Sequence, residues 1–270
     1  MLLLILVASV LLPVDGSGGG DPWAAAIPVL GGSVLLVLAA SIRSVLLQRE
    51  LSGPDGPRRI ERAARTQRLV QWAAVLIVVG GVIGLGFRDS VRSLVGDPPL
   101  LDEALTMAPA LLSIIAAWWI FQPFERRASE STLLRRIDDG QPVHPLPGRG
   151  AWVAMQVRSQ MLVVLVPIAL LAFTGESIRM LVSEVDSIPG WAETLLPIVA
   201  IVPVVALAPW LVVRLVGATP LPPGEVREIL EGMCRRAGVR VRDLLLWPTG
   251  GLVINAGVTG IVGSLRWVML

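Results

Sequence analysis

The chain has 270 residues, of which 54% are hydrophobic and only 16% are charged. Soluble domains carry about 25% charged residues, so this composition, with a mean hydropathy of +0.71, predicts an integral membrane protein. The single cysteine, Cys234, and the single histidine, His144, exclude an internal disulfide and any site within the chain that requires two imidazoles.

Residues 1–23 combine a short apolar segment with a Gly-rich linker. Met1–Pro13 has no basic residue before its apolar run and no small-residue cleavage site after it, which disfavours a standard signal peptide. A membrane-spanning helix needs about 20 residues, and this segment is shorter. It is therefore either a short sixth span that enters from the cytoplasm or a cleaved or interfacial segment. Asp15–Asp21 is predicted to be a flexible extracytoplasmic linker.

Residues 24–217 are predicted to form a polytopic bundle of transmembrane helices, because lipid offers no hydrogen-bond partner to an unpaired backbone. The predicted spans are Ala24–Leu47, Leu69–Phe87, Ala104–Phe121, Ser159–Phe173 and Leu195–Val216. The fourth span is the shortest, and Ala151–Val157 is expected to lengthen it. Gly80 and Gly84 form a small-xxx-small pair that permits close helix packing, although two such residues are also ordinary in a membrane helix.

Charge in the loops predicts the orientation of these spans. The four loops contain six, two, six and one arginines in chain order, and the positive-inside rule places the first loop, the third loop and the tail after Arg214 in the cytoplasm. Tryptophans near span ends agree with this arrangement, since indole rings favour the headgroup region; they are Trp23, Trp72, Trp191 and Trp210. We therefore predict a multi-pass protein of the cell membrane with a cytoplasmic C-terminal part.

The charged stretches do not indicate nucleic-acid binding or transport. Pro57–Arg68 is rich in arginine but lacks interleaved aromatic residues for base stacking, and it directly precedes a span. It is interpreted as a juxtamembrane helix that contacts anionic lipid headgroups. The five spans carry no charged residue near their centres, whereas transporters and pumps usually hold buried charges there. The lipid bilayer is thus the first expected partner, and the spans are predicted to be an anchor and packing scaffold.

Residues 218–270 are predicted to be the start of a small α+β cytoplasmic domain. Pro220–Pro223 is expected to be a rigid stop, after which Gly224–Ala237 has the periodicity of an amphipathic helix that Gly238 ends. The strands predicted after it are Val239–Trp247, Leu252–Ala256 and Ile261–Leu270, with a turn at 248–251 and a connection around Gly257–Gly260. The fold class is therefore mainly α, a transmembrane helix bundle followed by this α+β segment.

The tail contains a series of motifs in a fixed order. A helix ends in Arg235-Arg236-Ala237-Gly238-Val239, a strand follows, and then come Ile254-Asn255-Ala256-Gly257, Gly260 and Leu265–Leu270. This order resembles the start of the catalytic domain in membrane-bound zinc metallopeptidases of the HtpX and CAAX prenyl protease type. In that family an Asn-Ala strand and an apolar strand shortly precede the H-E-x-x-H helix. The resemblance covers about the last 50 residues of the chain.

The resemblance implies a membrane-anchored zinc endopeptidase that cleaves peptide or protein substrates at the cytoplasmic face. Asn255 and Ala256 would then lie on a strand that lines the substrate cleft and pairs with an extended peptide; alternatively, Asn255 makes only a turn-side hydrogen bond. The H-E-x-x-H motif, in which two imidazoles bind Zn²⁺, is absent from the chain. No catalytic or metal-binding residue is therefore assigned, and these 270 residues alone are expected to bind no zinc.

Two explanations of the missing motif stay open: a truncated peptidase whose catalytic part would follow, or a natural non-catalytic relative. A hypothesis of a different class is a non-enzymatic polytopic membrane protein whose small cytoplasmic module binds a partner. In each case the tail shows more apolar side chains than it can bury against itself. They are Val226, Ile229, Met233, Leu245, Ile254, Ile261 and Val268. In the resembling family, the zinc-binding helix would cover them.

Overall fold

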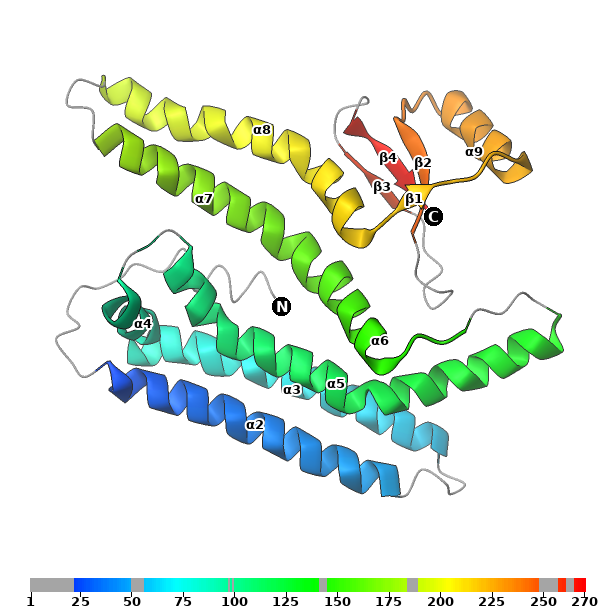
Figure 1. Cartoon of the computed structure of the whole chain (residues 1–270), viewed down its shortest axis with the longest axis horizontal. Helices are drawn as coiled ribbons and strands as arrows, with labels where there is room; N and C mark the ends of the chain where they lie inside the picture. Colours follow the sequence, from blue (N-terminus) through cyan, green and yellow to red (C-terminus); the bar gives the residue numbers. More distant parts are fainter. Residues whose placement is uncertain are drawn as a thin grey trace. The chain divides into compact units, whose positions relative to one another are not determined.

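A computed structural model describes residues 22–49, 56–96, 98, 100–140, 145–183, 189–247, 257–260 and 265–270 (Figure 1). The chain forms two compact units, Met1–Gln156 and Val157–Leu270. Met1–Pro13, His144, the turn at 248–251 and the predicted strand Leu252–Ala256 lie outside the described residues.

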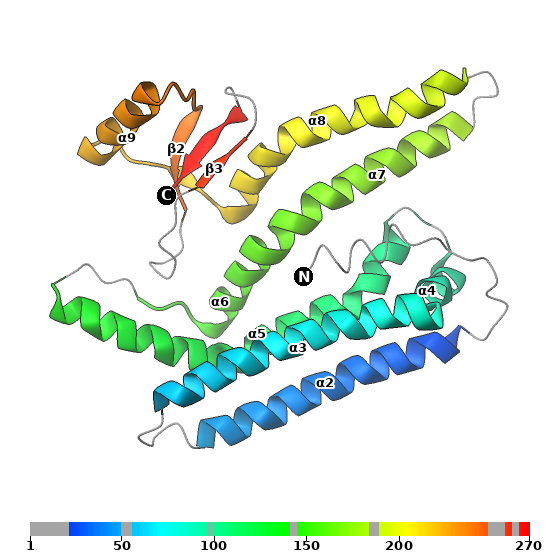
Figure 2. The same cartoon turned by 180° about the vertical axis from the view of Figure 1, so that it is seen from behind.

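The described part of the first unit contains five helices: α2 (Trp23–Arg49), α3 (Gly56–Leu85), α4 (Phe87–Val95), α5 (Leu101–Asp138) and α6 (Arg149–Gln156). Helices α2, α3 and α5 pack against one another, as both views show (Figures 1 and 2). Their shared core is built from small and aromatic side chains, among them Ala40, Ala63, Ala117, Phe121 and Phe124. The Ser44 hydroxyl of α2 donates a hydrogen bond of 3.2 Å to the Ile120 carbonyl of α5. Small residues thus let these helices approach closely enough for polar contact.

Helices α2 and α3 approach each other closely at Gly81. A Cβ atom at this position would overlap with the Val29 side chain, whereas a Cβ at Gly80 or at Gly84 would meet no atom within 4 Å. Of the two interpretations of Gly80 and Gly84, the structure therefore supports ordinary small residues of a membrane helix and not a packing pair. The contact face of α3 runs through Ala74, Val78 and Gly81, which are buried at helical spacing, and the predicted pair lies outside it.

The helices of the first unit extend beyond the predicted spans. Helix α3 begins at Gly56 and so includes the whole arginine-rich stretch before the second span, and α5 continues to Asp138. Charged residues one turn apart support the helical conformation in these extensions, as in the ion pair of 3.0 Å between Arg126 Nε and Glu130 Oε1. Helix α4 was not predicted at all. It follows α3 because Gly86, with a φ of 64°, turns the chain in the left-handed conformation.

The second unit begins with a π-helical segment, η1 (Val157–Leu162), and two long helices, α7 (Val163–Ser183) and α8 (Gly190–Val216). Helices α7 and α8 pack side by side (Figures 1 and 2). By length and composition, five helices of the described chain are suited to cross a membrane, namely Trp23–Arg49, Gly56–Leu85, Leu101–Leu134, Arg149–Val182 and Ile198–Val216. The predicted helical class and the count of five long apolar helices are thereby confirmed.

The second unit also contains helix α9 (Glu225–Arg236) and four strands, β1 (Thr219–Pro220), β2 (Asp243–Leu246), β3 (Gly257–Thr259) and β4 (Trp267–Met269). The sheet order is β1-β2-β4-β3. Strands β2 and β4 are parallel, with Leu244 opposite Val268. Strands β1 and β3 are antiparallel to their neighbours and form the two edges. The sheet is therefore completed by contacts between segments far apart in sequence.

Two predictions about the tail were wrong. Pro220 belongs to a strand and not to a stop, because β1 is an edge strand in which proline's missing N–H is tolerated. Gly257–Thr259 forms β3 and not a connection, because Val258 pairs with Val268 of β4. The helix prediction was accurate: α9 ends at Arg236, and Gly238 follows with a φ of 67°, as expected for a glycine that ends a helix.

Candidate functional site

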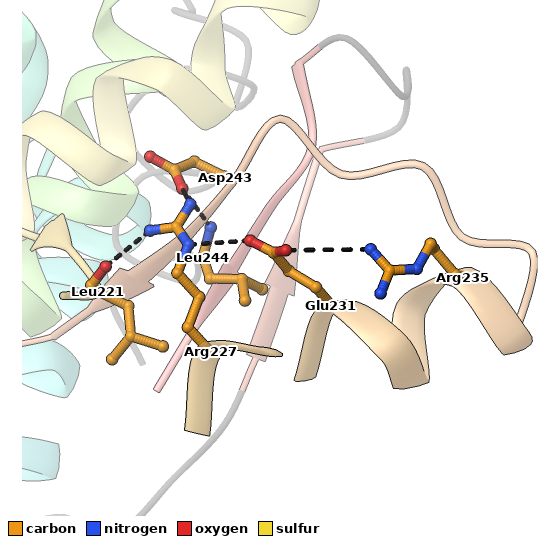
Figure 3. A network of polar contacts seen from close by, with 6 residues as sticks. All are labelled: Leu221, Arg227, Glu231, Arg235, Asp243 and Leu244. Atoms are coloured by element: carbon orange, nitrogen blue, oxygen red, sulfur yellow. Dashed lines mark hydrogen bonds and ion pairs between the residues drawn. The ribbon is translucent and has the colours of Figure 1, made fainter. Parts of the chain in front are cut away.

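Helix α9 is attached to the sheet through the side chain of Arg227 (Figure 3). Its Nη2 donates to Asp243 Oδ1 of β2 at 2.6 Å, and its Nη1 donates to the Leu221 carbonyl at 2.6 Å. Its Nε donates to Glu231 Oε1, one turn along the same helix, at 2.9 Å. One guanidinium therefore connects α9, β2 and the segment that follows β1.

The charges of this network stabilise one another. Hydrogen bonds to Glu231 and then to Asp243 raise the pKa of Arg227 above its usual value, since both favour the charged guanidinium. Asp243 Oδ1 also accepts the backbone N–H of Leu244 at 2.8 Å. This second hydrogen bond fixes the carboxylate at the start of β2. The network thus holds α9 in position relative to β2.

That orientation leaves the apolar face of α9 uncovered by the described residues. Val226, Ile229 and Met233 are 62%, 53% and 53% exposed, and no residue of the helix is buried. The sheet buries Leu244, Leu245 and Trp267 instead. An amphipathic helix usually turns its apolar stripe towards its own sheet. Here Arg227 makes the contact with β2, and the apolar stripe stays exposed.

A groove of about 730 Å³ lies between α9 and β2. Its lining includes four arginines, Arg227, Arg235, Arg240 and Arg242, and two acidic residues, Glu231 and Asp243. The Cys234 thiol also lines the groove, and the chain's one histidine, His144, lies outside the described residues. Among the described residues, no group of three or more His, Cys, Asp or Glu side chains could hold a metal ion. The lining of the groove is therefore charged, with more arginines than acidic residues.

The predicted substrate-binding residues, Asn255 and Ala256, lie outside the described residues. The strand that begins directly after them, β3, is an edge of the sheet, and Val258 within it is 62% exposed. Gly260 ends this strand with a φ of 106°, and a Cβ there would overlap with the Leu265 carbonyl and Arg266 Cα. Only glycine fits this approach of two backbone segments. The residues described next to the predicted cleft thus include an exposed strand edge.

A cluster of buried charges in the first unit was missed by the sequence analysis, which counted its members only as loop charges. Arg88 Nη2 of α4 lies 2.8 Å from Glu103 Oε1 of α5, and Arg92 Nε lies 3.2 Å from Asp102 Oδ2. The two arginines are one turn apart, and the two acids lie in the first turn of α5, where they also favour the helix dipole. Those two spacings were visible in the sequence. The cluster joins α4 to α5 and so has a structural role.

The chain was compared with protein-family models, with curated protein sequences and with solved structures. None of them matches it.

Proposed function

We propose that this chain anchors a cytoplasmic α+β module in the cell membrane and is the membrane-anchoring part of an integral-membrane zinc metalloendopeptidase. Five apolar helices support the anchor. Large apolar side chains are exposed along them, including Leu35, Leu69, Leu112, Val199 and Val202. Apolar surface of this extent is unfavourable in water and favourable in lipid.

The observation that carries the peptidase proposal is the uncovered apolar face of α9. Arg227 holds the helix with its charged face on β2, so Val226, Ile229 and Met233 point away from the sheet. Burying such side chains is favourable by about 1.5–3 kcal/mol each. An apolar element that packs on this face would therefore be strongly stabilised. In the family that the tail resembles, the zinc-binding helix is such an element.

The substrate of this proposed enzyme is an extended peptide that adds to the edge of the sheet. Strand β3 is described as an edge, and Asn255 and Ala256 directly precede it. Backbone hydrogen bonds along an edge strand give affinity with little sequence preference, which suits an endopeptidase. The zinc ligands would come from polypeptide outside residues 1–270, where the bound metal would activate the hydrolytic water.

The proposal is tested by extending the chain. Residues 1–270 would be expressed alone and joined to the in-frame sequence encoded after Leu270, and zinc content and cleavage of an unfolded peptide would be measured. We expect one zinc per extended chain, with cleavage that is lost when the glutamate of its H-E-x-x-H motif is changed to glutamine. A stop codon directly after Leu270, or an extension without zinc, would contradict the peptidase proposal.

A second candidate is a non-enzymatic membrane protein whose cytoplasmic module binds a partner. It is favoured by the contacts within the module: Arg227 joins α9 to β2, and the four described strands pair in one sheet. Amide hydrogen exchange on the 270-residue chain separates the two candidates. Cooperative protection of α9 and the sheet without an extension favours the partner-binding module, whereas protection that appears only with the extension favours the peptidase.

A further inference from the structure

A pocket of about 370 Å³ lies at the C-terminal end of α8. Two arginines and two tryptophans line it, Arg214 and Trp210 from α8, and Arg242 and Trp267 from the α+β module. The module is held close to α8 by the chain itself: α8 ends at Val216, and β1 begins at Thr219 and pairs with β2. The chain therefore keeps the two sides of the pocket close together.

Both arginines are held against aromatic rings. The guanidinium carbon of Arg214 lies 5.2 Å from the ring centre of Trp210, and that of Arg242 lies 5.6 Å from the ring centre of Trp267. Stacking of this kind restricts a guanidinium and leaves the N–H groups at its edge directed outward. Among the described residues that line the pocket, none is acidic. The side chain of Arg227, by contrast, is paired with Asp243 and Glu231.

The helix end does not cancel this positive charge. A helix C-terminus carries about half a negative charge on its last carbonyls. Here two of those carbonyls are satisfied: the N–H of Gly217 donates to the Arg214 carbonyl, and the N–H of Ala218 donates to the Val213 carbonyl, each at 3.2 Å. Two full positive charges therefore outweigh the partial negative charge, and the pocket attracts an anion.

We propose that this pocket binds the phosphate group of an anionic phospholipid from the leaflet that meets the C-terminal end of α8. The inference rests on the proposed insertion of α8 in the membrane and not on the peptidase assignment. Val199, Val202 and Leu207 expose apolar surface along α8 for the acyl chains. Trp210 is 41% exposed one turn before Arg214, at the position where indole rings meet headgroups. Two arginine forks match the oxygen atoms of a phosphate, and basic pockets at helix ends are typical sites for acidic headgroups.

The test uses the full chain extracted with its lipids and exchanged into mixed micelles that contain equal phosphatidylglycerol and phosphatidylcholine. Native mass spectrometry gives the ratio of the two lipids retained per chain. We expect wild type to prefer phosphatidylglycerol. The Arg214→Gln and Arg242→Gln variants should each lower that preference about tenfold, since each removes charge-assisted hydrogen bonds. Arg236→Gln, an exposed arginine that lines neither pocket, is the matched control and should leave the ratio unchanged.

Three further measurements make the outcome decisive. Arg214→Lys keeps the charge and should retain part of the preference, which separates loss of the site from loss of folding. Inorganic phosphate added to wild type should not displace the lipid. If millimolar phosphate displaced both lipids equally, the pocket would bind phosphate itself, and the proposal that its ligand is a phospholipid would be overturned. A wild-type chain that resists carbonate extraction from membranes but shows no phosphatidylglycerol preference would overturn this inference alone. A chain that carbonate releases would overturn the membrane proposal with it.

Discussion

Arg227 Nη2 and Asp243 Oδ1 lie 2.6 Å apart, and this contact decides which face of α9 meets the sheet. Asp243 begins β2, so the guanidinium is drawn to the end of the strand, and the apolar stripe of the helix is turned outward. The usual preference for burying an apolar stripe is worth several kcal/mol. Its reversal here leaves exposed apolar surface, which the proposed function assigns to the docking of another element.

Loss of the Arg227 side chain should release α9 from the sheet. In Arg227→Leu, the three hydrogen bonds to Asp243, Glu231 and the Leu221 carbonyl are lost, and Asp243 keeps only the Leu244 N–H. We expect the amides of α9 to lose protection from hydrogen exchange in the full chain, with β4 less affected. Arg236→Leu, at an exposed position of the same helix, is the control. Unchanged protection in Arg227→Leu would mean that other contacts hold α9.

Packing of α2 on α3 should depend on Gly81 and not on its neighbour. Gly81→Ala places a methyl group into Val29, and overpacking of this kind costs about 1–3 kcal/mol. Gly80→Ala meets no atom and should stabilise the helix by up to about 1 kcal/mol, because alanine has the higher helix propensity. Thermal unfolding in detergent should therefore shift in opposite directions for the two variants. Adding Val29→Ala should restore part of the stability lost in Gly81→Ala, and equal shifts for both glycines would contradict this interface.

Removing one partner of an ion pair between α4 and α5 should lower the free energy of unfolding more than removing both partners. Arg88→Met leaves the partly buried Glu103 without its partner at 2.8 Å, and breaking a fully buried pair costs about 3–5 kcal/mol, which is the upper limit here. The double variant Arg88→Met with Glu103→Met leaves no unpaired charge at these two positions and should recover most of the loss. Denaturant unfolding of the purified chain in detergent gives the coupling free energy. Additive effects of the two substitutions would show that the pair contributes nothing.

Structural features that depend on residues within one helical turn or one span could be predicted from the sequence. Contacts between residues far apart in the sequence could not. Hydropathy predicted five long apolar helices, and apolar periodicity together with Gly238 predicted α9. The face of α9 that meets the sheet depends on Asp243, 16 residues beyond Arg227. The packing position Gly81 depends on Val29 in another helix. Asn255 and Ala256 stay a prediction, since they lie outside the described residues.

The arginine distribution predicts that the loops with six arginines face the cytoplasm. Single cysteines would be introduced at Ser131 and at Ser187 in a chain whose own cysteine is replaced by Cys234→Ser. An impermeant thiol reagent added to intact cells should label Ser187→Cys and not Ser131→Cys. Lysis before labelling should make both reactive, which controls for local shielding. The opposite pattern would invert the orientation and place α9 and its sheet on the outer side.

Polar substitutions on the outward face of α9 should separate folding from function. Val226→Gln and Met233→Gln together change two exposed side chains, so the unfolding free energy of the 270-residue chain should stay within about 0.5 kcal/mol of wild type. Leu244→Gln, at a position that is 1% exposed, is the contrasting control and should unfold the sheet.

In the chain extended beyond Leu270, the same double variant should fail to pack the additional element, because about 1.5–3 kcal/mol of apolar burial is lost at each position. Zinc content and peptide cleavage would then fall together, although α9 and the sheet keep their protection from hydrogen exchange. Zinc retention and cleavage at wild-type levels would show that the outward face is not the docking surface of the catalytic element. The apolar stripe would then serve a separate partner, and the non-enzymatic module would be the better account of the tail.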